Sequence, residues 1–205
     1  MSTISFLYSI PYIILFILMY VNLIPLYKIN SSSSYKYTIW LQQFFIIVLM
    51  VVFFGFRGFI YTDWLNYYQV YDASPSLING AYPIKLFFEK PWEKGFLFYM
   101  IVCKTISSNY FFFQFVSCTI DFIILFNFFK RIIPEYIIFG FILFVLFSGI
   151  TIEFNLLRNS KAIMLFLISL KYIEEKNFVK YLILNSIGCL FHTTALLYLP
   201  LYFFL

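Results

Sequence analysis

Long apolar runs constrain this sequence more than any other feature. They cover residues 4–26, 38–56, 110–129, 135–151, 156–172 and 180–204. An α-helix rises about 1.5 Å per residue, so about 20 apolar residues cross the ~30 Å hydrocarbon layer of a bilayer. The composition agrees, because only 11% of the residues are charged, whereas soluble domains are about one quarter charged. We therefore predict an all-α, polytopic transmembrane helix bundle with about six spanning helices, built as one integral membrane domain over residues 1–205.

Residues 57–109 form the longest connection between these runs, and we expect interfacial or re-entrant helices in it. Within it, the stretch 94–107 is short for a crossing. If it does not cross, most cations between the apolar runs fall on one side, as the positive-inside rule requires of the cytoplasmic side. These cations are Lys28, Lys36, Lys130, Arg131, Lys171, Lys176 and Lys180. If 94–107 does cross, those from Lys130 onward move outside. We adopt the first topology, with the N-terminus and the long loop outside.

No motif of soluble-enzyme chemistry interrupts the apolar pattern. The sequence has no glycine-rich phosphate loop, no serine-hydrolase elbow and no nucleic-acid-binding motif. Its cysteines, Cys103, Cys118 and Cys189, lie in separate apolar segments without metal-ligand spacing, and we interpret them as small apolar filler. We expect no cofactor, no metal and no nucleic-acid partner, and the lipid bilayer as the surrounding medium.

The first polar segment begins with Arg57, at the outer end of the second apolar run. Thr62 is placed to cap a following helix, with Asp63 favourably located in its first turn. That helix would carry one aromatic face at i, i+3, i+4, i+7 spacing, lying along the membrane interface. The face consists of Trp64, Tyr67, Tyr68 and Tyr71. An interfacial arginine beside an aromatic belt is the alternative interpretation without a site.

Three further charges need an explanation. Glu93 stands at the start of the 94–107 stretch, where an acidic residue complements the helix dipole. Arg158 and Lys161 lie at the outer end of an apolar run and share one helix face with Asn155. Two cations outside run against the positive-inside bias, and a diphosphate would match the planar fork of an arginine. Snorkelling to lipid headgroups is the alternative.

Two ionisable groups lie within apolar runs. His192 is the only histidine, and Asn185, Cys189 and His192 would form a polar stripe on the last helix. Ionisable groups inside membranes usually face a cavity and carry function, although a histidine can also bond a neighbouring helix. Asp121 shares a face with Gln114 and Ser117, and we expect it to have a partner or to be protonated, in a helix-packing role.

Taken in order, these segments resemble the EpsG-like branch of the Wzy polysaccharide polymerases. The similar stretches are Phe56-Arg57, Tyr61-Thr62-Asp63-Trp64, Glu93-Lys94-Gly95-Phe96, Leu157-Arg158, Ala162-Ile163 and Phe191-His192-Thr193-Thr194-Ala195-Leu196. The family pattern has an Arg followed by Gly-Thr-Asp-Tyr, then Glu-Pro-Gly-Phe, Arg-Gln-x-Ile-Ala and Phe-His-x-Ser-Ala. This sequence departs from it at Tyr61, at Lys94 and at Asn159-Ser160-Lys161. Family members are longer, and the sequence ends inside an apolar run, so we expect it to be the N-terminal part of a longer protein.

The resemblance implies a bacterial cytoplasmic-membrane enzyme that joins oligosaccharide repeat units carried on undecaprenyl diphosphate. The reaction would occur on the outer face and yield capsule, exopolysaccharide or O-antigen, with a chain-length regulator or other assembly proteins as partners. Arg57, Arg158 and Lys161 would stabilise the diphosphate leaving group. Asp63, Glu93 or His192 would activate the acceptor hydroxyl. Trp64 and Tyr67 would stack on sugar rings.

Three alternatives to this function remain. The first is another membrane glycosyltransferase with a lipid-linked donor. The second is a flippase or transporter component for lipid-linked glycans, which would carry polar residues along a path at several depths. The third is a membrane subunit with a structural role only.

Overall fold

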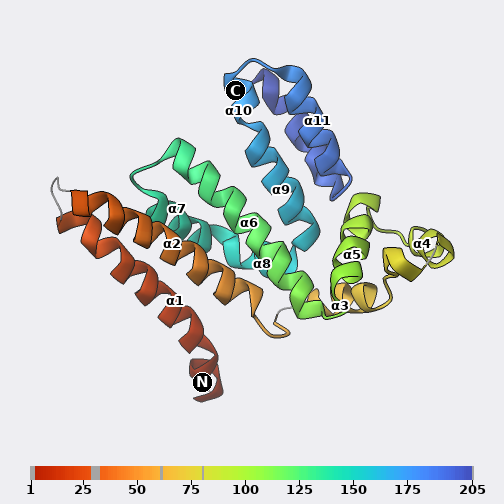
Figure 1. Ribbon diagram of the computed structural model, residues 1–205, viewed down its shortest axis with the longest axis horizontal. Coiled ribbons are helices and arrows are strands. Elements are labelled where there is room, and N and C mark those ends of the chain that lie inside the picture. The colour runs from red at the N-terminus through yellow and green to blue at the C-terminus, as the bar shows by residue number, and fades with distance from the viewer. Residues whose placement is uncertain (1–2, 29–32, 61, 80, 205) are drawn as a thin grey trace.

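The computed structural model describes residues 3–28, 33–60, 62–79 and 81–204, and every regular element within them is helical. The expected all-α class is thus confirmed. In chain order the elements are α1 (Thr3–Lys28), α2 (Ser33–Gly55), α3 (Trp64–Asp72), η1 (Leu77–Asn79), α4 (Ala81–Phe87), α5 (Lys94–Ile106), α6 (Tyr110–Ile132), α7 (Ile137–Phe144), η2 (Val145–Gly149), α8 (Ile150–Asn155), α9 (Leu157–Ser169), α10 (Lys171–Glu174), α11 (Phe178–Cys189) and η3 (Thr193–Phe203) (Figure 1).

The apolar helices differ in length. Among the described residues, Tyr37–Gly55, Tyr110–Ile132 and Ile137–Asn155 are long and apolar enough to cross a membrane. Ser9–Leu23, Phe178–Cys189 and Thr193–Phe203 are apolar but shorter. The expected runs 156–172 and 180–204 are each divided into shorter helices, so neither forms one uninterrupted span.

The larger apolar core lies between α1, α2, α6 and α7. Met50, Phe54, Phe122 and Phe141 are fully buried in it. The ring of Phe54 contacts those of Phe122 and Phe154 at centroid distances of 5.1 and 5.2 Å. These contacts hold the end of α2 against α6 and α8, which places Arg57, two residues after α2, inside the bundle.

A second, aromatic core lies between the helices of the 57–109 connection and α6. Tyr67 and Tyr71 of α3 pack against Phe96 of α5 and Phe113 of α6. Only 4% of Tyr67 and none of Tyr71 is exposed, whereas Tyr68 is 38% exposed. The prediction that this face lies along the membrane interface is therefore wrong for Tyr67 and Tyr71, because α5 and α6 cover that side of α3.

The segment Ile137–Asn155 is bent where η2 interrupts it. Ser148 adopts a positive φ of 76°, and a Cβ on Gly149 would collide with the carbonyl oxygen of Phe144. The helix resumes as α8 and ends at Asn155, beyond the expected end at residue 151. Glu153 is therefore part of the helix and is fully buried.

The last apolar run forms a helical hairpin. α11 ends at Cys189, the chain turns, and η3 packs along α11 so that the last described residues return towards α10 (Figure 1). The predicted single span over 180–204 is wrong. Gly188 favours this close approach, because an added Cβ would lie 3.2 Å from the Cβ of Ala195, which is tighter than ordinary van der Waals contact. His192 consequently lies at the turn and not on a helix face with Asn185 and Cys189.

This turn is fixed to the beginning of α5. The first N–H groups of a helix have no partner within the helix. Here the carbonyl oxygen of Leu190 accepts hydrogen bonds from the N–H groups of Gly95 (2.9 Å) and Phe96 (3.2 Å). A Cβ on Gly95 would lie 2.7 Å from both the Cβ and the carbonyl oxygen of Leu190. Glycine thus allows the contact that brings Glu93 next to the turn.

Candidate functional site

The candidate site is built around an ion pair between α9 and the residue preceding α5. Arg158 Nη1 donates to Glu93 Oε2 at 2.7 Å, across 65 positions of sequence. The guanidinium carbon of Arg158 lies 4.8 Å from the centre of the Trp92 ring, a cation–π contact. The side chains remain 27% and 15% exposed, so the pair is accessible from outside the protein.

Arg158 lines a polar pocket of about 360 Å³. The other lining residues are Asp63, Asn66, Tyr67, Gln69, Val70 and Trp92. One cation, one carboxylate and two amides therefore face a single cavity. Such a set can bind an anionic group at Arg158 and polar hydroxyl groups at the amides.

Asn155, the last residue of α8, joins the loop before α3 to the segment that leads into α9. Its Oδ1 accepts hydrogen bonds from Asp63 N–H (2.9 Å) and Thr62 Oγ1 (3.2 Å). Its carbonyl oxygen accepts one from Tyr67 Oη at 3.3 Å. The predicted cap by Thr62 is wrong, because α3 begins at Trp64 directly after Asp63, and the Thr62 hydroxyl donates to Asn155 instead. Asn155 thus holds Asp63 and Arg158 on the same cavity.

Glu93 is ionised at neutral pH. Burial opposes its charge, but a backbone hydrogen bond, Arg158 and nearby His192 together hold the pKa of Glu93 below its ordinary value. A carboxylate with a lowered pKa is a weak base, so the geometry favours Glu93 as the group that orients Arg158. Burial raises the pKa of Tyr67 against the opposing influence of Arg158, and Tyr67 therefore keeps its proton.

His192 lies beside this ion pair without lining the pocket. Its Nδ1 accepts the N–H of Thr194 (3.2 Å) and lies 2.9 Å from Thr194 Oγ1. Thr194 Oγ1 also donates to Asn159 Oδ1 at 2.7 Å, next to Arg158 in the chain. His192 therefore ties the hairpin turn to α9 and influences the site mainly through Glu93.

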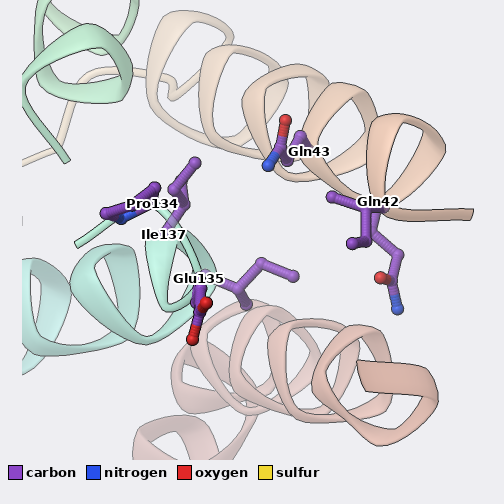
Figure 2. Close-up of a pocket in the computed structure, with 7 residues that line it drawn as sticks. Gln42, Gln43, Pro134, Glu135 and Ile137 are labelled. Carbon is purple, nitrogen blue, oxygen red and sulfur yellow. The ribbon is translucent and has the colours of Figure 1, made fainter. Parts of the chain in front are cut away.

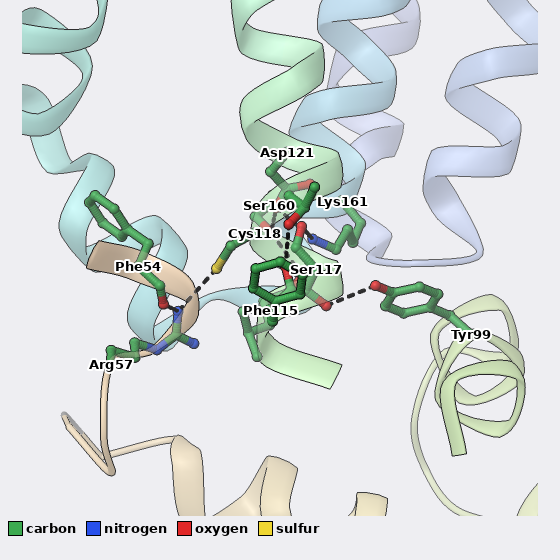
Figure 3. A network of polar contacts seen from close by, with 11 residues as sticks. Phe54, Arg57, Tyr99, Phe115, Ser117, Cys118, Asp121, Ser160 and Lys161 are labelled. Atoms are coloured by element: carbon green, nitrogen blue, oxygen red, sulfur yellow. Dashed lines mark hydrogen bonds and ion pairs between the residues drawn. The ribbon is translucent and has the colours of Figure 1, made fainter. Parts of the chain in front are cut away.

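Lys161 lies away from the pocket, although it follows Arg158 by three positions. Its Nζ donates to Asp121 Oδ2 (2.5 Å) and to the carbonyl oxygen of Ser117 (3.0 Å), and its side chain is 7% exposed (Figure 3). Ser160 Oγ also donates to Asp121 Oδ2, at 2.9 Å. The expectation that Asp121 has a partner is confirmed. The expectation that Lys161 shares the outward face of Arg158 is wrong, because the crossing of α6 and α9 draws Lys161 inward.

Arg57 is also buried away from the pocket. It is 4% exposed, and its Nη1 donates to the carbonyl oxygen of Phe54 (3.2 Å) and to Cys118 Sγ (3.5 Å) (Figure 3). Its guanidinium carbon lies 4.8 Å from the centre of the Phe154 ring. The structure therefore does not bring Arg57 to the cavity that Asp63 and Arg158 share.

Sequence reasoning missed a buried carboxylate, Glu153. It is fully buried, and neither of its carboxylate oxygens has a hydrogen-bond partner among the described residues. Arg57 Nη2, both side-chain amide atoms of Gln114 and Asp121 Oδ1 are likewise buried without a hydrogen-bond partner among the described residues. The interior beside α6 is therefore polar. The feature of the sequence that could have identified Glu153 is its position only two residues beyond the apolar run 135–151.

The two aromatic candidates differ in position. Tyr67 lines the pocket, but its ring packs edge-on against Trp92 and Phe96. Trp64 stacks on Phe59 with centroids 4.3 Å apart and is not among the lining residues. Trp92, which sequence analysis did not select, is the aromatic residue that flanks Arg158.

Another cavity lies at the opposite end of the bundle, away from the candidate site. It measures about 290 Å³ and includes Gln42 and Gln43 of α2 with Pro134, Glu135 and Ile137 (Figure 2). Its one charged lining residue is Glu135, which disfavours an anionic ligand. Within the described ranges, no group of three or more His, Cys, Asp or Glu residues could hold a metal ion.

Comparison with known protein families gives one match. The model of the EpsG family matches residues 40–205, which include every candidate site residue. The chain belongs to the EpsG family. No curated protein and no solved structure matches it. As an EpsG-family member with an apolar helical bundle, it is a membrane protein of polysaccharide biosynthesis.

In this EpsG-family chain, the motifs that resemble the family pattern contact one another in the structure. The Glu93-Lys94-Gly95-Phe96 and Phe191-His192-Thr193-Thr194 motifs meet where Leu190 bonds to α5. Leu157-Arg158 joins them through the Glu93–Arg158 ion pair. Segments far apart in sequence therefore form one site.

Proposed function

We propose that this protein is a polymerase that joins oligosaccharide repeat units from undecaprenyl-diphosphate carriers, for capsule, exopolysaccharide or O-antigen synthesis. The active site would face the outside of the bacterial cytoplasmic membrane. The observation that carries the proposal is the polar pocket that Arg158, held by Glu93, lines together with Asp63.

Arg158 is the group best placed for the diphosphate. Glu93 accepts from Nη1, while Nε is buried without a hydrogen-bond partner among the described residues. Glu93 engages Nη1 alone, and the N–H groups of the guanidinium fork that face the pocket suit phosphate oxygens. The low pKa of Glu93 keeps the carboxylate charged, so it holds the guanidinium in one orientation.

In the proposed transfer, Asp63 and Arg158 have different roles. The oxygen of an acceptor hydroxyl attacks the anomeric carbon of the donor sugar, and Asp63 accepts the hydroxyl proton. The bond between that carbon and the diphosphate oxygen breaks, and the diphosphate leaves with the electron pair. Arg158 stabilises the charge that develops on it. The products are a glycosidic bond and free undecaprenyl diphosphate.

The substitution Arg158→Lys tests the diphosphate role. Lysine keeps the charge but cannot reproduce the planar fork, so we expect a loss of about 2–4 kcal/mol of transition-state stabilisation, or roughly 30- to 1000-fold in rate. The measurement is polymer length on a gel, in cells that lack their own polymerase, with protein level checked in parallel.

The same gel separates this proposal from its alternatives. A ladder of repeat units supports a polymerase, whereas addition of a single sugar indicates another lipid-linked-donor glycosyltransferase. Normal chain length from a well-expressed Arg158→Lys protein would contradict the diphosphate role and leave snorkelling to headgroups as the better explanation.

One observation favours a transporter of lipid-linked glycans as a second candidate. Buried polar groups continue inward from Arg57 and Gln114 to Asp121, at the middle of α6. At that depth, however, the Asp121–Lys161 ion pair joins α6 to α9. Movement of a fluorescent polyprenyl-diphosphate sugar across proteoliposomes containing the protein would support transport, and its absence together with a polymer ladder would exclude it.

A further inference from the structure

A second polar cavity, of about 250 Å³, lies beside α3. The Arg158 pocket uses Asn66, Tyr67 and Gln69 of this helix, whereas the second cavity uses Tyr68, Tyr71 and Asp72. Different residues of one short helix therefore line two cavities, and none of the candidate site residues lines the second one.

One wall of this cavity is aromatic and accessible. Phe59, Tyr68 and Phe111 are 48%, 38% and 37% exposed. The ring of Phe59 lies 5.8 Å from that of Tyr68 and 5.2 Å from that of Phe111. Trp64 stacks on Phe59 at 4.3 Å, which holds the Phe59 ring in place. The rings of this wall therefore pack against one another and present apolar surfaces to the cavity.

The rim of the cavity carries hydrogen-bonding groups. The side chain of Asp72 is 71% exposed, and its ion pair with Lys104 Nζ is long at 3.9 Å. Asn109 Oδ1 caps α6 by accepting the N–H of Phe111 (2.9 Å), and its amide nitrogen donates to none of the other described residues. A carboxylate and an amide donor thus remain available beside the rings.

We propose that this cavity is a saccharide-binding subsite for the glycan that the protein extends. The faces of sugar rings pack on aromatic surfaces, while their hydroxyl groups bond carboxylates and amides. The exposed carboxylate of Asp72 disfavours an anionic lipid headgroup. Pockets for drug-sized ligands measure about 300–1,000 Å³, so a smaller cavity fits one sugar unit.

This inference rests on the proposed function in naming the glycan. Phe59 and Asp72 lie outside the Arg158 pocket, so the subsite would hold a sugar away from the reacting bond. It would select the repeat unit without taking part in the chemistry.

Two probes and three variants test the subsite. The full protein in nanodiscs is titrated with oligosaccharides obtained by partial hydrolysis of the polymer that the host cells make. Phe59→Ala and Asp72→Asn should each weaken this binding roughly tenfold, as expected for the loss of one good contact. Farnesyl diphosphate, the probe for the Arg158 pocket, should bind both variants as it binds the wild type.

Leu65→Ala is the matched control, because Leu65 is a 46% exposed apolar residue of α3 that lines neither cavity. It should leave both titrations unchanged. Unchanged oligosaccharide binding in Phe59→Ala and Asp72→Asn would overturn the subsite, as would equal weakening in Leu65→Ala or no binding by the wild type. Failure of farnesyl diphosphate to bind the wild type would count against the Arg158 pocket alone.

Discussion

Arg158 and Lys161 show how differently two neighbouring cations can be used. Both follow the break at Leu156, yet Arg158 reaches Glu93 at the pocket and Lys161 reaches Asp121 in the interior. A buried ion pair contributes little net stability, but removal of one partner leaves an uncompensated charge. Single substitutions at these positions therefore have to be compared with double substitutions.

The Asp121–Lys161 pair provides the first such comparison. We expect Lys161→Met alone to destabilise the protein by about 3–5 kcal/mol, because Asp121 is then buried without its cation. Adding Asp121→Asn should recover most of the loss. Thermal unfolding in detergent measures the stability, and polymer length measures the activity. A stable double variant that makes no polymer would assign the Asp121–Lys161 pair a role in the reaction.

The Glu93–Arg158 pair predicts a specific pH dependence. Because the pKa of Glu93 is lowered in the folded protein, the pair stabilises the fold above the ordinary carboxyl pKa, and this contribution is lost as the pH falls through the lower, folded-state value. We expect the difference in Tm between the wild type and Glu93→Gln to stay constant from about pH 8 to about pH 5 and to close below about pH 4. Closure already near pH 6 would show that the pKa is not lowered.

At the scale of elements, the contact between α5 and the α11–η3 turn positions the site. Two backbone hydrogen bonds to Leu190 join these elements, and Glu93 immediately precedes α5. The ion pair with Arg158 therefore depends on a contact that contains no candidate site residue. Glycine at position 95 is what allows the two backbones to meet.

Gly95→Ala tests this dependence. Its Cβ would lie 2.7 Å from Leu190, so the turn must move, at a cost of about 1–3 kcal/mol and with shorter polymer. Gly58→Ala is the control, because a Cβ there has no atom within 4 Å. Tm and polymer length should change for Gly95→Ala only. Equal effects of the two substitutions would argue against a positioning role for the α5 contact.

At the scale of the whole molecule, the hairpin of α11 and η3 changes the expected topology. A single span over 180–204 would place its two ends on opposite sides of the membrane. The observed hairpin returns the chain towards α10, so residues near its end lie on the same side as the 171–180 segment (Figure 1). If the lysines of that segment lie inside, both ends of the α11–η3 hairpin are expected in the cytoplasm.

Labelling with a membrane-impermeant thiol reagent tests this topology in a variant without native cysteines. Ile78→Cys should be labelled from outside, whereas Lys176→Cys and Phe204→Cys should be labelled only after the membrane is opened. Ile78 and Phe204 are 80% and 81% exposed, so accessibility does not limit the reaction. Labelling of Ile78→Cys and Lys176→Cys from the same side would contradict a non-crossing α5, and labelling of Phe204→Cys from outside would contradict the hairpin.

The helical membrane class and the order of the motifs followed from local properties of the sequence. Apolar run length determines which segments are membrane helices, and short motifs identify the family, because both depend on residues near one another in the chain. The partners of the charges did not follow, since Glu93 and Arg158 are 65 positions apart and Asp121 and Lys161 are 40 apart. Where helices cross, and where glycines let the chain turn back, determines which polar groups meet. Helical periodicity therefore placed Arg158 and Lys161 on one face, whereas packing against α6 sent them to different sites.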